Sequence, residues 1–222
     1  MKRLLIGILF FTAPTCALAQ DDGKLNALYT EFSVGASFIP EVSTKTITIT
    51  DGVDTATGRI NLNYDTALTV GAEVGIAGVG IPEVRLAVGY EFLQARFDSG
   101  VAVGTVNGVS GSLAFTRADV ASFGIDLDND VHLVTGNIYY DLPDWGRVTP
   151  YLGVGVGAAF IQNADTQLAV TASAGIRIPL NDNIYAGVRY RYYHISGPTD
   201  DFGIEYDAIS NLSIMLLLGI TN

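Results

Sequence analysis

The sequence predicts an all-β fold, and more closely an eight-stranded antiparallel up-and-down transmembrane β-barrel. Three observations lead to it: eight segments alternate apolar and polar residues, the connectors between them alternate in length, and the charged residues share one face. The mean hydropathy is +0.34 and only 16% of residues are charged. No run beyond the first residues approaches the roughly 20 apolar residues that a membrane helix needs.

The N-terminus has the pattern of a secretory signal peptide. Lys2 and Arg3 precede the apolar run LLIGILFF, and Ala17-Leu18-Ala19 is a small-x-small cleavage site. We therefore expect residues 1–19 to be a signal peptide and 20–222 to be a single outer-membrane barrel domain. The chain's one cysteine, Cys16, lies inside this segment. Its neighbours do not suit lipidation.

The composition excludes several classes of function. Without Lys2 and Arg3, ten basic residues stand against 23 acidic ones, a formal charge of −13. Such a surface repels nucleic acid. Without Cys16 there is no thiol for a disulfide or a thiolate metal site, and we expect no cofactor.

Eight segments alternate with period two, which is typical of strands with one apolar face. Each reaches the roughly 9–11 residues that a tilted membrane strand requires. The segments are 29–38, 64–76, 83–92, 131–142, 149–160, 166–178, 183–193 and 211–220.

The connectors separate the two ends of the predicted barrel. AGVGIP, PDWGR and PLNDN are short, whereas 39–63, 93–130 and 197–210 are long, with the short QNAD as the exception. Short turns on one side and long loops on the other are typical of an outer-membrane barrel with both termini in the periplasm. The long segments would then be extracellular loops.

The charged residues of the segments all lie opposite the aliphatic face. Alternation alone would also suit a soluble sandwich or lipocalin-like barrel, but the signal peptide and the loop asymmetry favour lipid outside. The charges then form an ion-pair network in the lumen, since desolvated charges must pair. An alternative is that they gate a low-conductance, porin-like channel. The predicted network comprises Glu31, Glu73, Arg85, Glu91, Arg177, Arg189 and Arg191.

The stretch TPYLGVGVGAAF (149–160) could also be the phosphate turn of a dinucleotide site. Such a turn stands between a strand and a helix. Here the glycines lie inside an alternating run and no helical pattern follows. The interpretation as a strand instead places Gly153, Gly155 and Gly157 in a narrow lumen, where they leave room for long side chains.

Residues 136–160 carry a resemblance to a known family. Asn137, Tyr139, Tyr140 and Asp141, a short turn, and then Pro150-Tyr151-x-Gly153-x-Gly155-x-Gly157 resemble the opacity-type and alphaproteobacterial small surface antigens, which are eight-stranded barrels of the OmpA/OmpX type. AGVRYRYYH (186–194) is similar to the family's penultimate strand. The chain departs from the family in ending Gly219-Ile220-Thr221-Asn222 and not in an aromatic residue.

Two smaller motifs suggest other sites. Asp126, Asp128 and Asp130 are spaced like the start of a calcium loop, but the glycine and the later Glu of that loop are missing. His194 and Ser196, with Glu205 or Asp207 downstream, resemble the triad of the lipid A deacylase family, although Gly197 stands where that family has Asn. We expect a solvated acidic loop and no catalytic site.

The predicted function is that of a non-enzymatic outer-membrane protein. It would be a structural part of the Gram-negative cell envelope and present its loops as a surface antigen, with adhesion or host contact as the finer hypothesis. A low-conductance channel and a lipid A deacylase are the alternatives. The expected partners are outer-membrane lipids and lipopolysaccharide, the barrel-assembly machinery and an unidentified extracellular ligand.

Overall fold

The computed structural model describes residues 27–51 and 54–222; the predicted signal peptide lies outside them. Apart from one short helix, the regular elements of these residues are strands, so the all-β prediction is confirmed. The elements are β1 (Ala27–Phe38), β2 (Val42–Ser43), β3 (Ile47–Asp51), β4 (Asp54–Tyr64), β5 (Ala67–Ala77), β6 (Val84–Ala95), β7 (Phe97–Val106), β8 (Val109–Thr116), α1 (Arg117–Ser122), β9 (Asn129–Asp141), β10 (Thr149–Ile161), β11 (Gln167–Pro179), β12 (Ile184–Ile195) and β13 (Ile209–Thr221).

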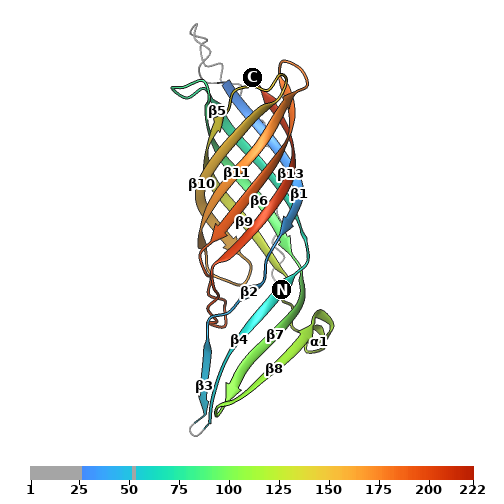
Figure 1. Ribbon diagram of the computed structural model, residues 1–222, viewed down its shortest axis with the longest axis vertical. Coiled ribbons are helices and arrows are strands. Elements are labelled where there is room, and N and C mark those ends of the chain that lie inside the picture. The colour runs from blue at the N-terminus through green and yellow to red at the C-terminus, as the bar shows by residue number, and fades with distance from the viewer. Residues whose placement is uncertain (1–26, 52–53) are drawn as a thin grey trace.

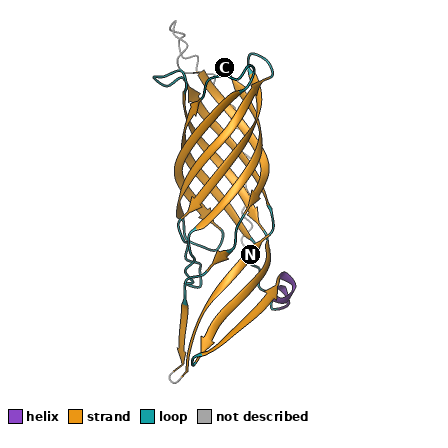
Figure 2. Cartoon of the chain, viewed as in Figure 1, coloured by secondary structure: helices purple, strands orange, loops and turns teal. Residues whose placement is uncertain are grey.

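Eight strands close into an antiparallel barrel, as predicted (Figure 1, Figure 2). Their order is β1-β13-β12-β11-β10-β9-β6-β5, and β1 completes the circle by pairing with both β13 and β5. Each of the eight predicted segments coincides with one of these strands to within a few residues. We call the end with the short connections 78–83, 142–148 and 180–183 the turn end, and the opposite end the sheet end.

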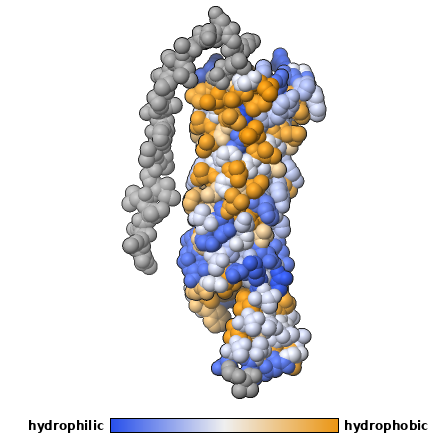
Figure 3. All heavy atoms as spheres, turned by 90° about the vertical axis from the view of Figure 1, so that its left-hand side faces the viewer, coloured by the Kyte–Doolittle hydropathy of each residue, from blue (hydrophilic) through white to orange (hydrophobic). Residues whose placement is uncertain are grey.

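The outer wall of the barrel is apolar and the lumen is polar. Phe32, Val88 and Leu216 are 56%, 64% and 64% exposed, whereas Glu31 and Arg189 are each 1% exposed. Hydrophobic residues cover much of the barrel wall in Figure 3, and hydrophilic residues gather below it, near the second sheet. A soluble barrel would bury its aliphatic face, so lipid is the medium that this wall fits.

The segments predicted as the two longest loops, 39–63 and 93–130, are not irregular, and this part of the prediction was wrong. They form a second sheet in the order β2-β4-β7-β8, with β3 also paired to β4. The helix α1 follows β8 and begins with a capping box between Thr116 and Asp119. In the described chain we find no helix with the length and apolar character needed to cross a bilayer.

The second sheet is a continuation of the barrel. β4 and β5 are separated by two residues and β6 and β7 by one, and β4 pairs with β7 just as β5 pairs with β6. A hydrogen bond from the Asp65 amide to the Arg96 carbonyl (2.8 Å) joins the two interruptions. The runs β4–β5 and β6–β7 therefore form one long antiparallel ribbon that leaves the barrel and projects from the sheet end (Figure 1).

The glycines of β10 face the lumen, where a Cβ on any of the three would overlap a neighbouring residue. A side chain at Gly153 would overlap the ring of Tyr139, and one at Gly157 would overlap the carbonyl oxygen of Val134 in β9. Leu152, which has the opposite parity to these glycines, points outward and is exposed. The bare face thus gives room to a tyrosine and to the close approach of β9.

Candidate functional site

The lumen holds four arginines and four carboxylates from six strands. The structure places all seven predicted charged residues there and adds Asp141 from β9. They form two clusters. We call Glu31, Glu73, Glu91, Arg189 and Arg191 the central cluster, and Arg85, Arg177 and Asp141 the turn-end cluster.

The central cluster is organised around Glu73. Its Oε2 lies 3.6 Å from Nη1 of Arg189 and 3.5 Å from Nη2 of Arg191. Arg189 also pairs with Glu31, and Arg191 with Glu91. The two arginines are therefore shared among three carboxylates, and all five side chains are buried.

Hydroxyl groups saturate the carboxylates further. Glu73 accepts hydrogen bonds from Tyr139 (2.7 Å) and Tyr29 (3.1 Å), and Glu31 accepts one from Tyr185 (3.0 Å). A buried ion pair is tolerated when the remaining lone pairs are satisfied in this way. These tyrosines share the inward parity of the charged residues, so the alternation of the sequence contains the signal that identifies them.

The turn-end cluster combines ion pairing with aromatic contact. Arg85 donates from Nε to Asp141 (3.1 Å), and Arg177 pairs with the same carboxylate. The guanidinium carbon of Arg85 lies 4.7 Å from the ring centre of Tyr139 and 4.9 Å from that of Tyr151. Such cation–π contacts stabilise a desolvated arginine.

An apolar layer lies between the central cluster and the sheet end. Its buried residues include Leu93, Leu133, Ala159 and Ile195, all inward-facing. Tyr193 belongs to this layer and donates its hydroxyl to Glu91, so it joins the layer to the central cluster. From the turn end to the sheet end, the lumen is thus filled first by ions and then by hydrocarbon.

Two carboxylates of the acidic motif 126–130 form contacts with other residues of the protein. Asp128 accepts a hydrogen bond from the Phe97 amide (2.8 Å) and lies 3.4 Å from Arg117, while Asp126 accepts from the Asp128 amide (3.0 Å). In residues 27–51 and 54–222, no three acidic, His or Cys side chains are grouped as metal ligands would be.

Two of the three residues of the deacylase alternative, His194 and Glu205, form side-chain hydrogen bonds with other partners. His194 Nδ1 lies 3.2 Å from the Ser210 hydroxyl on the outer wall. Glu205 accepts a hydrogen bond from Lys45 Nζ (2.7 Å), which raises the pKa of that lysine. None of the side-chain hydrogen bonds in the described chain connects His194, Ser196 and Glu205.

The connection 196–208 braces the second sheet. The Lys45 amide donates to the Glu205 carbonyl (2.7 Å) and the Asp207 amide to the Ser43 carbonyl (2.8 Å). Arg59 of β4 also forms an ion pair with Asp207. These contacts join the β12–β13 connection to β2 and β4. The second sheet is therefore attached to the sheet end of the barrel both by its continuation into β5 and β6 and by this connection.

Similar proteins match this architecture. NspA, a neisserial surface protein, aligns at a TM-score of 0.52 and 12% identity over 87% of this chain and 96% of its own. The outer membrane protein AlkL aligns at 0.53 and 14% identity, over 92% and 94%. Uncharacterized proteins of Brucella abortus and Brucella melitensis are 31% identical over a stretch that covers 28% of this chain. This chain spans only 29% of the length of these Brucella proteins.

At such identities the solved structures report the fold alone, an outer-membrane barrel. A family model adds the assignment of the sequence itself. The model for the outer membrane protein beta-barrel domain matches residues 4–217. Together with the closed eight-stranded barrel and its apolar wall, this match shows that the chain belongs to the outer membrane protein beta-barrel domain family.

Proposed function

We propose that this outer-membrane protein is a non-enzymatic surface protein that carries the second sheet outside the cell for contact with an external partner. The observation on which this rests is the continuous ribbon β4–β5 and β6–β7. A binding surface on a rigid scaffold needs such an anchor. The turn end, where β1 begins at Ala27 and β13 ends at Thr221, would then face the periplasm.

The second sheet has the surface character of a contact site. Ile49, Val106, Val109 and Leu113 are 65%, 56%, 74% and 68% exposed, and the register of the strands places them on one face of this sheet, outside the barrel wall. Lipid does not cover this part of the chain if the barrel wall marks the membrane. Clustered apolar residues exposed to water typically mark an interaction surface, which supports adhesion as the finer role.

Orientation can be tested with single cysteines, because the mature chain would have none of its own. We expect Val109→Cys, next to the β7–β8 turn, to react with a membrane-impermeant maleimide on intact cells. Asn181→Cys, at the turn end, should react only after the outer membrane is permeabilised. The reverse pattern would refute the proposed orientation.

Adhesion can be tested by shortening the sheet. Replacing 47–58 and 103–112 by short Gly–Ser turns removes the paired tips of β3–β4 and β7–β8 and leaves the barrel strands whole. We expect cells with this variant to lose most of the attachment to epithelial monolayers that the full chain confers. The double variant Val109→Ser, Leu113→Ser should reduce it in part. Equal attachment by cells with the full chain, the shortened variant and the double variant would refute the adhesive role, provided that all three proteins show the same heat-modifiable mobility on gels.

The channel alternative makes the opposite prediction for conductance. The lumen is occupied by two ion clusters and an apolar layer, and eight-stranded barrels have interiors that side chains fill. We therefore expect planar-bilayer recordings of the purified protein to show no reproducible single-channel steps. Steps of constant size that disappear with an Arg191→Met variant would favour the channel.

A further inference from the structure

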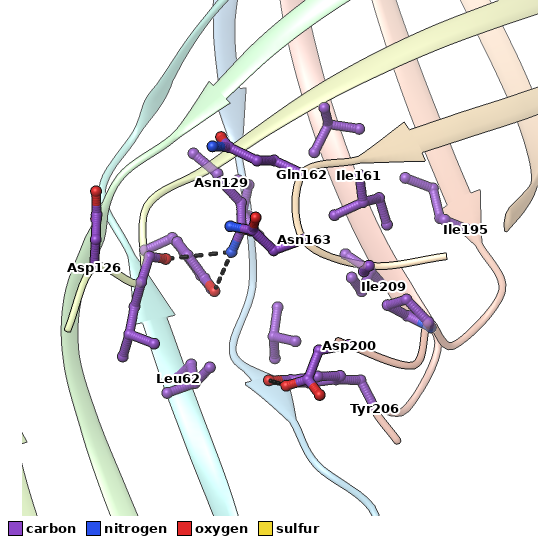
Figure 4. A pocket seen from close by; sticks show the side chains of 18 of the residues that line it. Leu62, Asp126, Asn129, Ile161, Gln162, Asn163, Ile195, Asp200, Tyr206 and Ile209 are labelled. Carbon is purple, nitrogen blue, oxygen red and sulfur yellow. Dashed lines mark hydrogen bonds between the residues drawn. The ribbon is translucent and has the colours of Figure 1, made fainter. Parts of the chain in front are cut away.

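A cavity of about 460 Å³ lies at the sheet end, where the barrel meets the second sheet (Figure 4). Barrel strands β6, β9, β10, β12 and β13 contribute to its lining, together with β4 and the segments 124–127 and 198–206. The volume falls within the roughly 300–1,000 Å³ typical of small-molecule sites. The cavity adjoins the apolar layer and is separated by it from the ion clusters.

The lining is mostly hydrocarbon. Leu93 and Ile195 come from the apolar layer, Leu62 from β4, and Ile161 and Ile209 from strand ends at the barrel mouth. In Figure 4 the side chains of Ile161, Ile195, Ile209 and Leu62 lie around one open space. Water forms no hydrogen bonds with hydrocarbon, whereas an apolar molecule of the right size would bury this surface away from water.

Among the described residues of this lining, one buried side-chain polar atom has no hydrogen-bond partner. Asn211 of β13 lines the cavity and is 4% exposed, and its Oδ1 accepts no hydrogen bond. An unpaired buried acceptor is unfavourable, because it has lost its hydrogen bonds to water and gained none in the protein. A ligand with an N–H or O–H group at one end would satisfy it, and its apolar body would contact the isoleucines and leucines.

The charge around the cavity selects among such ligands. Asp126 and Asp201 are exposed carboxylates that contribute to the lining. Asp200 is saturated by the amides of Phe202 and Ile204 (both 2.9 Å) and by the Tyr206 hydroxyl (3.1 Å). Of the residues that the structure describes, no arginine or lysine lines the cavity. An anionic head group, such as that of a fatty acid, would be repelled here.

We propose that this cavity binds a small lipophilic alcohol or amine, with its donor group on Asn211 Oδ1. The site is distinct from the contact surface of the second sheet and does not depend on the adhesive role. It defines a ligand by three properties: an apolar body, one hydrogen-bond donor, and no negative charge.

The test uses the full mature chain in detergent micelles, with 1-aminoanthracene as a fluorescent reporter. The quantity measured is the ratio of the 1-decanol concentration to the n-decane concentration that displaces half of the reporter. We expect this ratio to be at least tenfold lower for the wild-type protein than for Asn211→Leu. Partition into micelles is the same for both proteins, so a change in this ratio isolates the hydrogen bond. Decanoate at neutral pH should displace more weakly than 1-decanol.

Two further variants separate the cavity from the outer wall. Leu62→Trp lies outside the barrel strands and fills the cavity, so it should abolish reporter binding while heat-modifiable gel mobility is kept. Leu216→Trp, on the lipid-facing wall, should leave reporter binding unchanged. The proposal is overturned if Leu62→Trp binds the reporter as the wild type does, or if the decanol-to-decane ratio is the same in Asn211→Leu.

Discussion

Replacing Glu73 by glutamine is expected to lower the free energy of unfolding by about 3–5 kcal/mol, the range found when one partner of a buried ion pair is removed. Glu73 is 3% exposed and lies within 3.6 Å of two arginines, while two tyrosine hydroxyls donate to it. The amide keeps the shape of the side chain but removes its charge. Arg189 and Arg191 would then share only Glu31 and Glu91.

The measurement is equilibrium unfolding by urea of the protein folded into lipid vesicles. Glu205→Gln is the matched control, because the same chemical change there breaks an ion pair with Lys45 whose side chains are 58% and 57% exposed. Exposed pairs contribute about 0–1 kcal/mol. Equal losses for the two variants would show that the lumen is hydrated and that the clusters do not fill it.

Replacing Gly157 by alanine is expected to lower the stability of the barrel by about 1–3 kcal/mol, the effect of forcing extra atoms into a packed interior. The new Cβ would overlap the carbonyl oxygen of Val134 and lie 2.7 Å from the Cα of Thr135. Both are backbone atoms of β9, so no rotamer change can relieve the contact. The strands must move apart.

Gly136→Ala is the control for this second prediction. Gly136 lies in β9 itself, on the outward face, and a Cβ there would meet nothing nearer than 3.9 Å. We expect this variant to unfold at the same urea concentration as the wild type or slightly higher, since glycine is unfavourable in a strand. If both glycines tolerate alanine equally, β9 and β10 are farther apart than described.

The alternation of the sequence was sufficient to predict the barrel. Period two fixes which residues share a face, and charges such as Glu31 and Arg189 on one face show which face avoids lipid. The same parity contains Tyr139 and Asp141, so the polar filling of the lumen was readable in outline. The ion-pair partners could not be predicted, because Arg191 and Glu91 are 100 residues apart in the sequence and meet only through the closure of the barrel.

The second sheet was missed for a different reason. Segments such as ITITD and VAVGTV contain strand-forming residues, but they are short and lie between two barrel segments, where a long loop was expected. They become strands because β4 and β7 extend a pairing that β5 and β6 have already set in register. Local pattern is weak evidence where tertiary pairing decides the structure.

The sequence by itself thus determined the wall: eight strands, their parity, and the medium on each side. The tertiary structure alone decided the ion-pair partners, the projecting sheet, and the cavity in which Asn211 remains unpaired. The physical reason is that parity is a local property of an extended chain. Registers, ion pairs and cavities depend instead on which distant strands the closed barrel brings together.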